Sequence, residues 1–581
     1  MADYDYVIDG SILEGEIAIK PYAFHLRRKG HPYNCIFTSI TIPNSVTHIG
    51  EKAFSGCHDL TQVVIPGSVT TINEYAFEEC ISLPSVHIPE GVTTMSRGVF
   101  LKCISLETVE LPSSLTSIPR VAFSGCRNLV RIHIPEGITT IEPFAFKDCT
   151  SLESIRIPSS VTMIGEGAFE GCTALKSVQI PEGVSVIGQR AFTNCKNLTS
   201  IYIPRSVTTI GDGVLAGCIN LESVMGAHEN APYICKNNCL VEANSNTLIM
   251  GCKNSVVPAD GSVTTIGRDA FNGCTSLTHF VIPDGVRTIG IGAFAGCSNL
   301  IDIDIPVGVT EIGEAALQDC TSMETIQIPH TVTRIGGDAF RGCKSLKSVD
   351  IPDGVSEIDM GVFEKCVSLA NVHIPDGVTS ISVRAFANCI NLKCITLPKG
   401  LHEIIAGAFE FSGLTELVLP DDVAYIGECA FYGCANLANV VFPNTKISIC
   451  KNAFSFCASL ESIHIPREGS SISTSAFADC QKLSHVVLPD DIYIPFLAFK
   501  DCINLRSVFL QNRAYVGERA FSTCRKLKYV YYNGSNNDFS QNVTVDSYNG
   551  YFNKAVHFYS VTQPLEKGKY WHYVDGVPTA W

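Results

Sequence analysis

Apolar and polar positions recur along the chain with a period of 22 or 23 residues. One unit runs from Ile164 to Pro181 and reads I-G-E-G-A-F-E-G-C-T-A-L-K-S-V-Q-I-P. Its segment Leu175-x-x-Val178-x-Ile180 ends in an alternation of apolar and polar residues, which is typical of a short strand with one buried face. Pro181 cannot donate to a strand ladder and ends the strand. The pattern therefore predicts one short strand per unit.

The other apolar positions of the unit predict that the units stack. Val184, Ile187, Ala191, Phe192 and Cys195 follow the strand, and equivalent residues recur in the neighbouring units. A single unit cannot bury these side chains by itself, whereas stacked units share one continuous core.

The number of units follows from the Ala-Phe pair, which occurs once in each unit. It recurs about 21 times between Ala23-Phe24 and Ala520-Phe521, with variants such as Val99-Phe100. Strands of successive units are expected to pair in parallel at about 4.8 Å. We therefore expect a leucine-rich-repeat solenoid, α/β or mainly β, built as a curved right-handed array of about 21 coils. Its concave side carries a parallel sheet, and its outer side carries irregular or short helical turns.

Two interruptions divide the array. The first unit is stretched by about seven residues near Pro32, which suits an N-terminal cap. Between Cys218 and Cys274 the interval is 56 residues, and there the segments 239–242 and 247–250 flank an Asn-rich turn that predicts a β-hairpin. This insertion either carries specificity or decorates a coil without breaking the stack. We divide the chain into an N-terminal cap and first repeat at 1–43, repeats at 44–225, a hairpin-like insertion at 226–257, repeats at 258–535, and a C-terminal cap and aromatic tail at 536–581.

The C-terminal tail leaves the repeat and contains both tryptophans, Trp571 and Trp581. The stretch from Phe539 to Tyr559 is expected to seal the last coil, because terminal repeats need a closing surface. For the stretch from Tyr570 onward, a cap and an aromatic platform for a ligand both remain open.

Most of the cysteines occupy one position of the repeat. Nineteen of the 26 follow one another at steps of 22 or 23 residues, apart from the insertion and a gap at Ser412. Free cysteine packs as a small hydrophobe, and equivalent side chains of stacked coils point the same way, so cross-linking them would require distortion. We expect a ladder of buried, reduced thiols, with disulfides as the alternative.

One group of residues has the composition of a metal site. The insertion holds His228, Cys235, Cys239 and Cys252 within 25 residues, and tetrahedral zinc accepts such ligands. The spacing H-x6-C-x3-C-x12-C matches no strong zinc motif. We expect packed thiols and no cofactor, with zinc as the weaker alternative.

The strand alternation also predicts a surface. Because Val178 and Ile180 point inward, Ser177 and Gln179 must face outward. The column equivalent to Gln179 varies along the chain, from polar and basic through acidic to apolar and aromatic, with neighbours about 5 Å apart. We expect it to bind a partner through the following residues: His87, Glu110, His133, Arg156, Gln179, Tyr202, Asp304, Gln327, Asp350, His373, Val418, Val441, His464, Val487, Phe509 and Tyr531.

The C-terminal part of this column is the most distinctive. The members from Val418 to Tyr531 would form an exposed apolar strip, and such patches tend to mark interaction sites. Tyr202, Phe509 and Tyr531 fit the composition of interface hot spots. The alternative is that β-branched and aromatic residues simply suit an exposed strand.

Composition narrows the class of function. A formal net charge of −15 disfavours nucleic acid as a partner, because such binding needs clustered Lys and Arg. No apolar run approaches the roughly 18 residues of a membrane span. The sequence also lacks a phosphate-binding Gly-rich loop, a G-x-S-x-G elbow and an H-E-x-x-H helix. His87, His133, His373 and His464 recur at one repeat position, which is typical of surface residues. We expect a protein that binds another protein and is not an enzyme.

The unit resembles the BspA-type leucine-rich repeats over roughly residues 17–535, through the pattern I-G-x-x-A-F-x-G-C-x-x-L-x-x-[IV]-x-[IL]-P. The segments 531–535, 555–559 and 570–579 are similar to the closing segments of bacterial members. The resemblance implies a curved solenoid that acts in adhesion or protein recognition, often at a cell surface, with a host extracellular-matrix or cell-surface protein as partner. The start Met1-Ala2-Asp3 lacks the pattern of a secretory leader, which favours the cytoplasm and an intracellular protein-interaction scaffold as the alternative.

Overall fold

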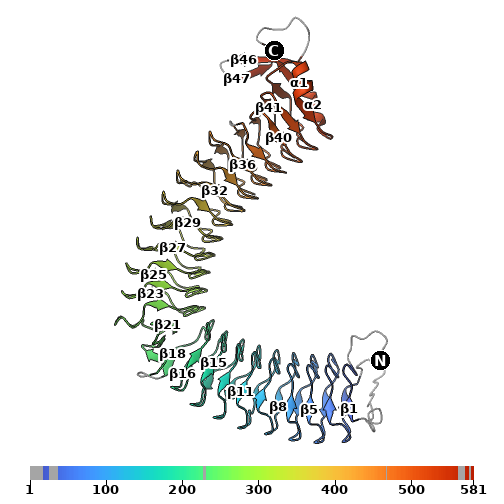
Figure 1. Cartoon of the computed structure of the whole chain (residues 1–581), viewed down its shortest axis with the longest axis vertical. Coiled ribbons are helices and arrows are strands. Elements are labelled where there is room, and N and C mark those ends of the chain that lie inside the picture. Colours follow the sequence, from blue (N-terminus) through green and yellow to red (C-terminus); the bar gives the residue numbers. More distant parts are fainter. Residues whose placement is uncertain are drawn as a thin grey trace. The chain divides into compact units, whose positions relative to one another are not determined.

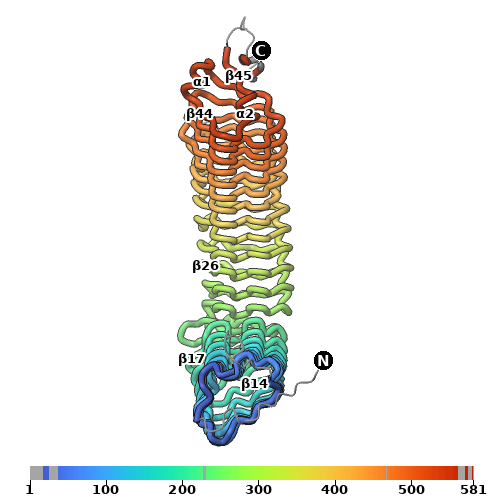
Figure 2. Tube along the Cα trace, turned by 90° about the vertical axis from the view of Figure 1, so that its right-hand side faces the viewer, coloured from blue at the N-terminus to red at the C-terminus, as the bar shows by residue number. Residues whose placement is uncertain are grey.

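The computed structural model describes residues 17–24, 37–226, 231–465, 468–560, 569–574 and 577–580. The chain folds as a parallel β-solenoid of about 22 turns, mainly β with little helix. It divides into two compact units, residues 1–277 with 293–297 and residues 278–292 with 298–581. We call them the N-terminal and the C-terminal unit. Successive coils of each unit can be followed by colour along the tube (Figure 2).

Most coils carry a first strand where the alternating segment predicts one, and we call these the A strands (Figure 1). In the N-terminal unit they are β2 (Ser39–Thr41), β4 (Gln62–Val64), β6 (Ser85–His87), β8 (Thr108–Glu110), β10 (Arg131–Ile132), β12 (Ser154–Arg156), β14 (Ser177–Gln179), β16 (Ser200–Ile203) and β18 (Ser223–Gly226). In the C-terminal unit they are β23 (His279–Val281), β25 (Asp302–Asp304), β28 (Ser348–Asp350), β30 (Asn371–His373), β33 (Glu416–Val418), β35 (Asn439–Val441), β37 (Ser462–His464), β39 (His485–Val487), β41 (Ser507–Leu510), β43 (Tyr529–Tyr532) and β45 (Val556–Tyr559). The tail then extends this sheet by β46 (Tyr570–Val574), which is parallel to β45, and by β47 (Val577–Ala580), which is antiparallel to β46.

A second short strand follows in each coil, and we call these the B strands. In the N-terminal unit they are β1 (Ala18–Ile19), β3 (His48–Ile49), β5 (Thr71–Ile72), β7 (Thr94–Met95), β9 (Ser117–Ile118), β11 (Thr140–Ile141), β13 (Met163–Ile164), β15 (Val186–Ile187), β17 (Thr209–Ile210) and β22 (Thr265–Ile266). In the C-terminal unit they are β24 (Thr288–Ile289), β26 (Glu311–Ile312), β27 (Arg334–Ile335), β29 (Glu357–Ile358), β31 (Ser380–Ile381), β32 (Glu403–Ile404), β34 (Tyr425–Ile426), β36 (Ser448–Ile449), β38 (Ser471–Ile472), β40 (Ile492–Ile494), β42 (Ala514–Val516) and β44 (Val543–Val545). The sequence did not predict these strands, because most of them span only two residues.

Most strands of the repeats pair with their equivalents one coil away, in parallel and in register. Ser154 lies opposite Ser177, Ile155 opposite Val178 and Arg156 opposite Gln179. The B strands do the same, as between Ile141 and Ile164. Equivalent residues therefore form continuous columns, so one position of the repeat defines one line along each unit.

The turns that join the strands are not helical. Each coil places residues in the left-handed region, for example Arg190 with φ 56° and Asn194 with φ 60°. Asn tolerates this conformation better than most residues. Among the described residues, helices occur after the repeats, as α1 (Asn536–Asn542) and α2 (Gly550–Lys554). The outer side thus has turns and a second strand where the sequence left open irregular or short helical turns.

The Gly of the Ile-Gly motif is required by the stacking of coils. A Cβ atom on Gly165 would lie 2.6 Å from the backbone nitrogen of Pro143 in the preceding coil. On Gly188 it would lie 2.4 Å from the backbone nitrogen of Glu166. These separations are far below van der Waals contact, so any larger residue would push neighbouring coils apart.

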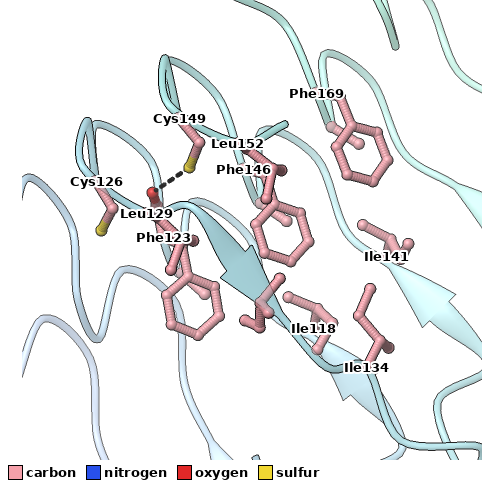
Figure 3. Packing of buried hydrophobic residues seen from close by; sticks show 14 of the residues in the cluster. Ile118, Phe123, Cys126, Leu129, Ile134, Ile141, Phe146, Cys149, Leu152 and Phe169 are labelled. Carbon is pink, nitrogen blue, oxygen red and sulfur yellow. Dashed lines mark hydrogen bonds between the residues drawn. The ribbon is translucent and has the colours of Figure 1, made fainter. Parts of the chain in front are cut away.

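Two ladders fill the core (Figure 3). The Phe rings of successive coils stack, with centroids 5.5 Å apart between Phe123 and Phe146. Beside them the repeat cysteines are buried, and most of their thiols donate to the carbonyl of a Phe in the coil behind, as Cys149 does to Phe123 at 3.2 Å. The thiol thus fills a small apolar space and satisfies a buried carbonyl, which explains why cysteine recurs there.

The free-thiol prediction is confirmed for the ladder from Cys80 onward. Cys57 at its N-terminal end is disulfide-bonded, so the prediction is wrong for that residue. At the gap in the ladder, Ser412 is buried and its hydroxyl lies 3.3 Å from the thiol of Cys434.

The insertion contains the predicted hairpin. Strand β20 (Cys239–Glu242) pairs antiparallel with β21 (Thr247–Met250), and β19 (Tyr233–Lys236) adds a third antiparallel strand that the sequence did not predict. Strand β21 pairs in parallel with β22 of the next coil. The hydroxyl of Tyr233 accepts the backbone amide of Ile210 at the edge of β17. The insertion therefore continues the B strands of the N-terminal unit.

Candidate functional site

The outward column of the A strands is the surface that the sequence selected. We define it by the residue equivalent to Gln179, which follows the buried centre of its strand. In β14, Ser177 and Gln179 are exposed and Val178 is buried, and β12 repeats this pattern. The predicted register is therefore confirmed. Whether this column binds a partner remains a prediction.

In the N-terminal unit the column is exposed along its length. The exposed members are Thr41, Val64, His87, Glu110, His133, Arg156, Gln179, Tyr202 and Met225. His87 lies 2.6 Å from Glu110 in the next coil, and Arg156 lies 3.1 Å from Glu136. Both pairs are exposed to water, so they arrange charges on the surface and add little to stability.

The central part of the C-terminal unit carries the acidic members. Asp304, Gln327, Asp350, His373 and Thr396 are exposed. Residues 394–396 do not form a strand, so the A strands are interrupted between β30 and β33. A hollow of about 450 Å³ lies there, and its lining includes Asp350, His373, exposed Cys394 and Lys399. The column is therefore hollowed at this coil, whose residues form no strand.

Farther along the C-terminal unit the column is apolar and open to solvent. Val418 is 61% exposed and Val441 is 56% exposed, on the adjacent strands β33 and β35. His464 on β37 is exposed as well. Two large apolar side chains side by side on a water-facing sheet are the part of the column that burial by a partner would stabilise most.

The predicted exposed strip does not continue to Tyr531. Phe509 is 8% exposed and Tyr531 is 7% exposed, and Val487 is only half-exposed. Trp571 from the tail covers them, with its ring 5.3 Å from Phe509 and 5.4 Å from Tyr531. The prediction that Phe509 and Tyr531 are surface contacts is therefore wrong, because a segment 40 or more residues away in sequence lies over them.

Trp571 also decides the role of the tail. Strand β46 pairs in parallel with β45, which places Trp571 beside Tyr559. Trp571 is fully buried, and its indole nitrogen donates to the carbonyl of Tyr532 at 2.9 Å. At this residue the tail is a cover and not an exposed platform. Trp581 lies outside the described residues.

The proposed metal ligands do not form a site within the described residues. Cys235, Cys239 and Cys252 are buried, and His228 lies outside the described part of the chain. The thiol of Cys252 donates to the carbonyl of Glu222 at 3.2 Å. In the ranges that the structure describes, no cluster of three His, Cys, Asp or Glu could hold a metal ion. The three thiols pack and bond as core residues.

The buried thiols are poor nucleophiles. Burial raises the pKa of Cys218 and Cys343 to about 12. Since the thiolate is the reactive form, these groups stay protonated and inert near neutral pH. The histidines of the outward column are exposed, whereas the ladder cysteines of the described residues are buried in the core. The two kinds of side chain therefore do not meet on the surface.

The structure also shows an exposed aromatic ridge that sequence reasoning missed. Phe411 is 44% exposed and Phe456 is 47% exposed, and both adopt left-handed φ angles of 55° and 61°. Tyr432 lies between them, with ring centroids 5.5 Å and 5.2 Å away. The equivalent position in most other coils holds Gly, Asp, Asn or Lys, such as Gly171 and Asp148. A bulky aromatic residue where the backbone favours Gly is the signal that would have found it.

A buried carboxylate is a second feature that the sequence did not reveal. Glu364 has a side chain that is 7% exposed, and it contacts Arg341 and Arg384 at 3.3 Å each, from the coils on either side. Arg384 also lies 3.4 Å from Glu410. Since Glu364 has cations on both sides, its charge ties three coils together.

In the part of the chain that the structure describes, no helix is both long and apolar enough to span a bilayer.

The chain matches the family model for the BspA type leucine rich repeat region over residues 28–151, 116–239, 242–369, 311–438 and 425–549. No curated protein matches it. Among solved structures, it is similar to a leucine rich cell surface protein from Faecalibacterium prausnitzii, with 28% identity, a TM-score of 0.41, and coverage of 65% of this chain and 81% of that one. It is also similar to a leucine-rich repeat protein from Bacteroides ovatus, with 27% identity, a TM-score of 0.34, and coverage of 80% and 88%.

The family model covers well over half of the sequence, and its repeat is the coil seen in the structure. Leucine-rich repeats present a regular surface on which a partner protein binds. The chain therefore belongs to the BspA-type leucine-rich repeat family and has a general role in protein interaction.

Proposed function

We propose that this protein is a non-enzymatic adhesin that binds a protein of a host or neighbouring cell surface, or of the extracellular matrix, through the outward column of the A strands. The column includes the exposed members between His87 and Tyr202, those between Asp304 and His373, and Val418, Val441 and His464. Phe509 and Tyr531 are excluded from the contact surface because Trp571 covers them.

One observation carries the proposal. The inward positions of the repeat hold nearly the same residues in every coil, whereas the outward column changes its chemistry from coil to coil and stays exposed. A column that only maintained the fold would have no reason to combine charged, aromatic and apolar members in one register. Val418 and Val441 are the strongest anchors, because their exposed apolar surface is stabilised only when a partner removes it from water.

The test replaces Val418 and Val441 together by Ser and measures binding of the full-length protein to intact cells and to immobilised matrix proteins. We expect binding to weaken at least about tenfold, which is the effect of losing two central apolar contacts. The matched control replaces Val307 and Ile390, which are 65% and 56% exposed in the same unit but lie outside the column. Equal binding by the test and control variants would remove this column as the contact surface.

An intracellular scaffold is the second candidate, and the free thiols favour it. The described chain carries 24 free cysteines beside the disulfide-bonded Cys57, and chains in which nearly all cysteines are free are typical of reducing compartments. Burial shields most of these thiols, which is why adhesion remains the stronger proposal. Surface-protease accessibility on intact cells separates the two, because a scaffold would be cleaved only after lysis.

A further inference from the structure

The last coils of the C-terminal unit form a hollow that the outward column does not include. It has a volume of about 440 Å³ and is lined by Arg519, Ser522, Thr523, Tyr548, Gly550, Tyr551 and Lys554. This volume falls within the roughly 300–1,000 Å³ of sites that hold small molecules. The lining combines two cations, two tyrosines and two aliphatic hydroxyl groups, and it contains no carboxylate.

Helix α2, which contributes Gly550, Tyr551 and Lys554 to the lining, is packed against the last coil. The ring of Phe552 stacks on Phe521 with centroids 4.9 Å apart, so helix α2 continues the Phe ladder of the repeats. Asn549 is 2% exposed, accepts the backbone amide of Phe521 at 3.0 Å and donates to the carbonyl of Gly517 at 2.9 Å. Because Asn549 is pinned on both sides, Tyr548 and the residues after it are held in place before any ligand arrives.

Both cations of the hollow keep donor groups that no ion pair among the described residues uses. The guanidinium of Arg519 lies over the ring of Tyr548, 4.7 Å from its centroid, and its Nε lies 3.5 Å from Glu518. The remaining guanidinium nitrogens can still donate to a planar carboxylate. Lys554 is exposed, and its ammonium has no ion-pair partner among the described residues. Lys569 adds a further positive charge nearby, because its ammonium contacts the carbonyl of Lys554.

The aromatic and hydroxyl groups complete the lining. Tyr548 is 68% exposed and Tyr551 is 45% exposed. Tyr rings offer an apolar face and a polar edge, which suits a ligand that has both. The hydroxyl of Thr523 is already bonded to Asp501, whereas that of Ser522 has no hydrogen-bond partner among the described residues. The hollow thus offers free donors beside exposed ring faces.

Charge limits the ligand to a small anion. Residues 501–560 contain seven Lys and Arg against four Asp and Glu, whereas the whole chain has a net charge of −15. A long polyanion such as a nucleic acid would be repelled by the rest of the surface. A ligand with one carboxylate, a ring with an apolar face and several hydroxyl groups matches what the hollow offers.

We propose that this hollow binds a sugar acid, a carboxylated monosaccharide unit of an acidic glycan. Arg519 and Lys554 bind the carboxylate, Tyr548 and Tyr551 pack against the sugar ring, and Ser522 bonds to a ring hydroxyl. The protein then has a glycan site at its C-terminal end in addition to the protein-binding column.

The test titrates the full-length protein by calorimetry with methyl glucuronide and with N-acetylneuraminic acid, which represent two sources of sugar acid. Methyl glucoside, which lacks the carboxylate of methyl glucuronide, serves as the uncharged control. We expect at least one acid to bind, and the glucoside to bind at least about tenfold more weakly, because it lacks the charge-assisted hydrogen bonds. Binding of neither acid, or equal binding of glucuronide and glucoside, would overturn the proposal.

Variants localise the site. Arg519→Gln should weaken binding of the acid at least about tenfold, and Tyr548→Asn, which suits the left-handed φ of 63°, should weaken it as well. Lys526→Gln removes the same charge from an exposed position outside the hollow and should leave affinity unchanged, with melting checked for all three. An equal loss with Lys526→Gln, or binding of inorganic phosphate or a short single-stranded oligonucleotide as tight as that of the sugar acid, would refute the assignment.

Discussion

Strands β35 and β41 present equivalent residues to the same side of the C-terminal unit, yet Val441 is 56% exposed and Phe509 is 8% exposed. Both residues follow the inward-facing valine at the centre of an A strand, which is partly buried in β35 and buried in β41. The difference comes from Trp571, which covers Phe509. Val441 has no such cover among the described residues.

The comparison shows that the repeat decides where a side chain points, whereas residues outside the repeat decide whether it is exposed. The same position is therefore a contact surface in one place and part of a terminal core in another. It also explains why the cap is aromatic. Trp571, Tyr559 and Tyr531 form a small second core that closes the solenoid, as a terminal coil requires.

The largest expected effect comes from ionising the buried thiols of the core that both regions share. Burial raises the pKa of Cys434 and of Cys524 to about 12, from an ordinary value of about 9. Below pH 9 both the folded and the unfolded thiols are protonated, so stability is unaffected. Between pH 9 and 12 the thiols ionise in the unfolded chain but stay protonated in the folded one. Each buried cysteine therefore lowers the free energy of unfolding by about 1.4 kcal/mol per pH unit.

Because many thiols act together, we expect steep alkaline unfolding that includes the coils beneath both Val441 and Phe509. Circular dichroism against pH measures the unfolding, and thiolate absorbance should rise only as the fold is lost. Thiolate absorbance that rises near pH 9 in a protein that remains folded would show that the ladder is accessible to solvent.

The second effect should separate the two regions. Trp571→Ala removes the cover and should lower the free energy of unfolding of the last coils by about 3–5 kcal/mol, as is typical when a large buried aromatic is deleted. Hydrogen exchange should increase in β41 and β43 and stay unchanged in β33 and β35. Val441→Ser is the matched control, and it should change stability by no more than about 0.5 kcal/mol. Unchanged exchange in β41 would show that the cover is not needed there.

The smallest effect tests whether exposed charges beside the A strands contribute to stability. Lys347 lies 2.7 Å from Glu324 one coil away, and the two side chains are 63% and 53% exposed. An ion pair this exposed should contribute about 0.2–1 kcal/mol. Lys347→Ala should therefore shift the urea midpoint only slightly, and 1 M salt should remove most of the difference. A shift as large as that of Trp571→Ala would mean that this surface is structural.

The sequence by itself determined most of the fold. Its 23-residue period, the buried Val178 and Ile180, and the thiol ladder from Cys80 follow from one repeated pattern of apolar residues. The hairpin at Cys239–Glu242 and Thr247–Met250 was also predictable, because its two segments flank an Asn-rich turn. These features are local or recur at a fixed spacing, so they can be predicted from the sequence without knowing which distant segments lie together.

The tertiary structure decided the rest. The B strands are too short to leave an alternation, and Cys57 forms a disulfide although its sequence position fits the ladder of free thiols. The burial of Phe509 and Tyr531 depends on a contact with Trp571 from outside the repeat. The hollow at Arg519 and Lys554 joins residues from different coils. Sequence periodicity fixes a side chain's direction, but exposure and pockets depend on which distant segment lies beside it, and only the folded chain establishes that.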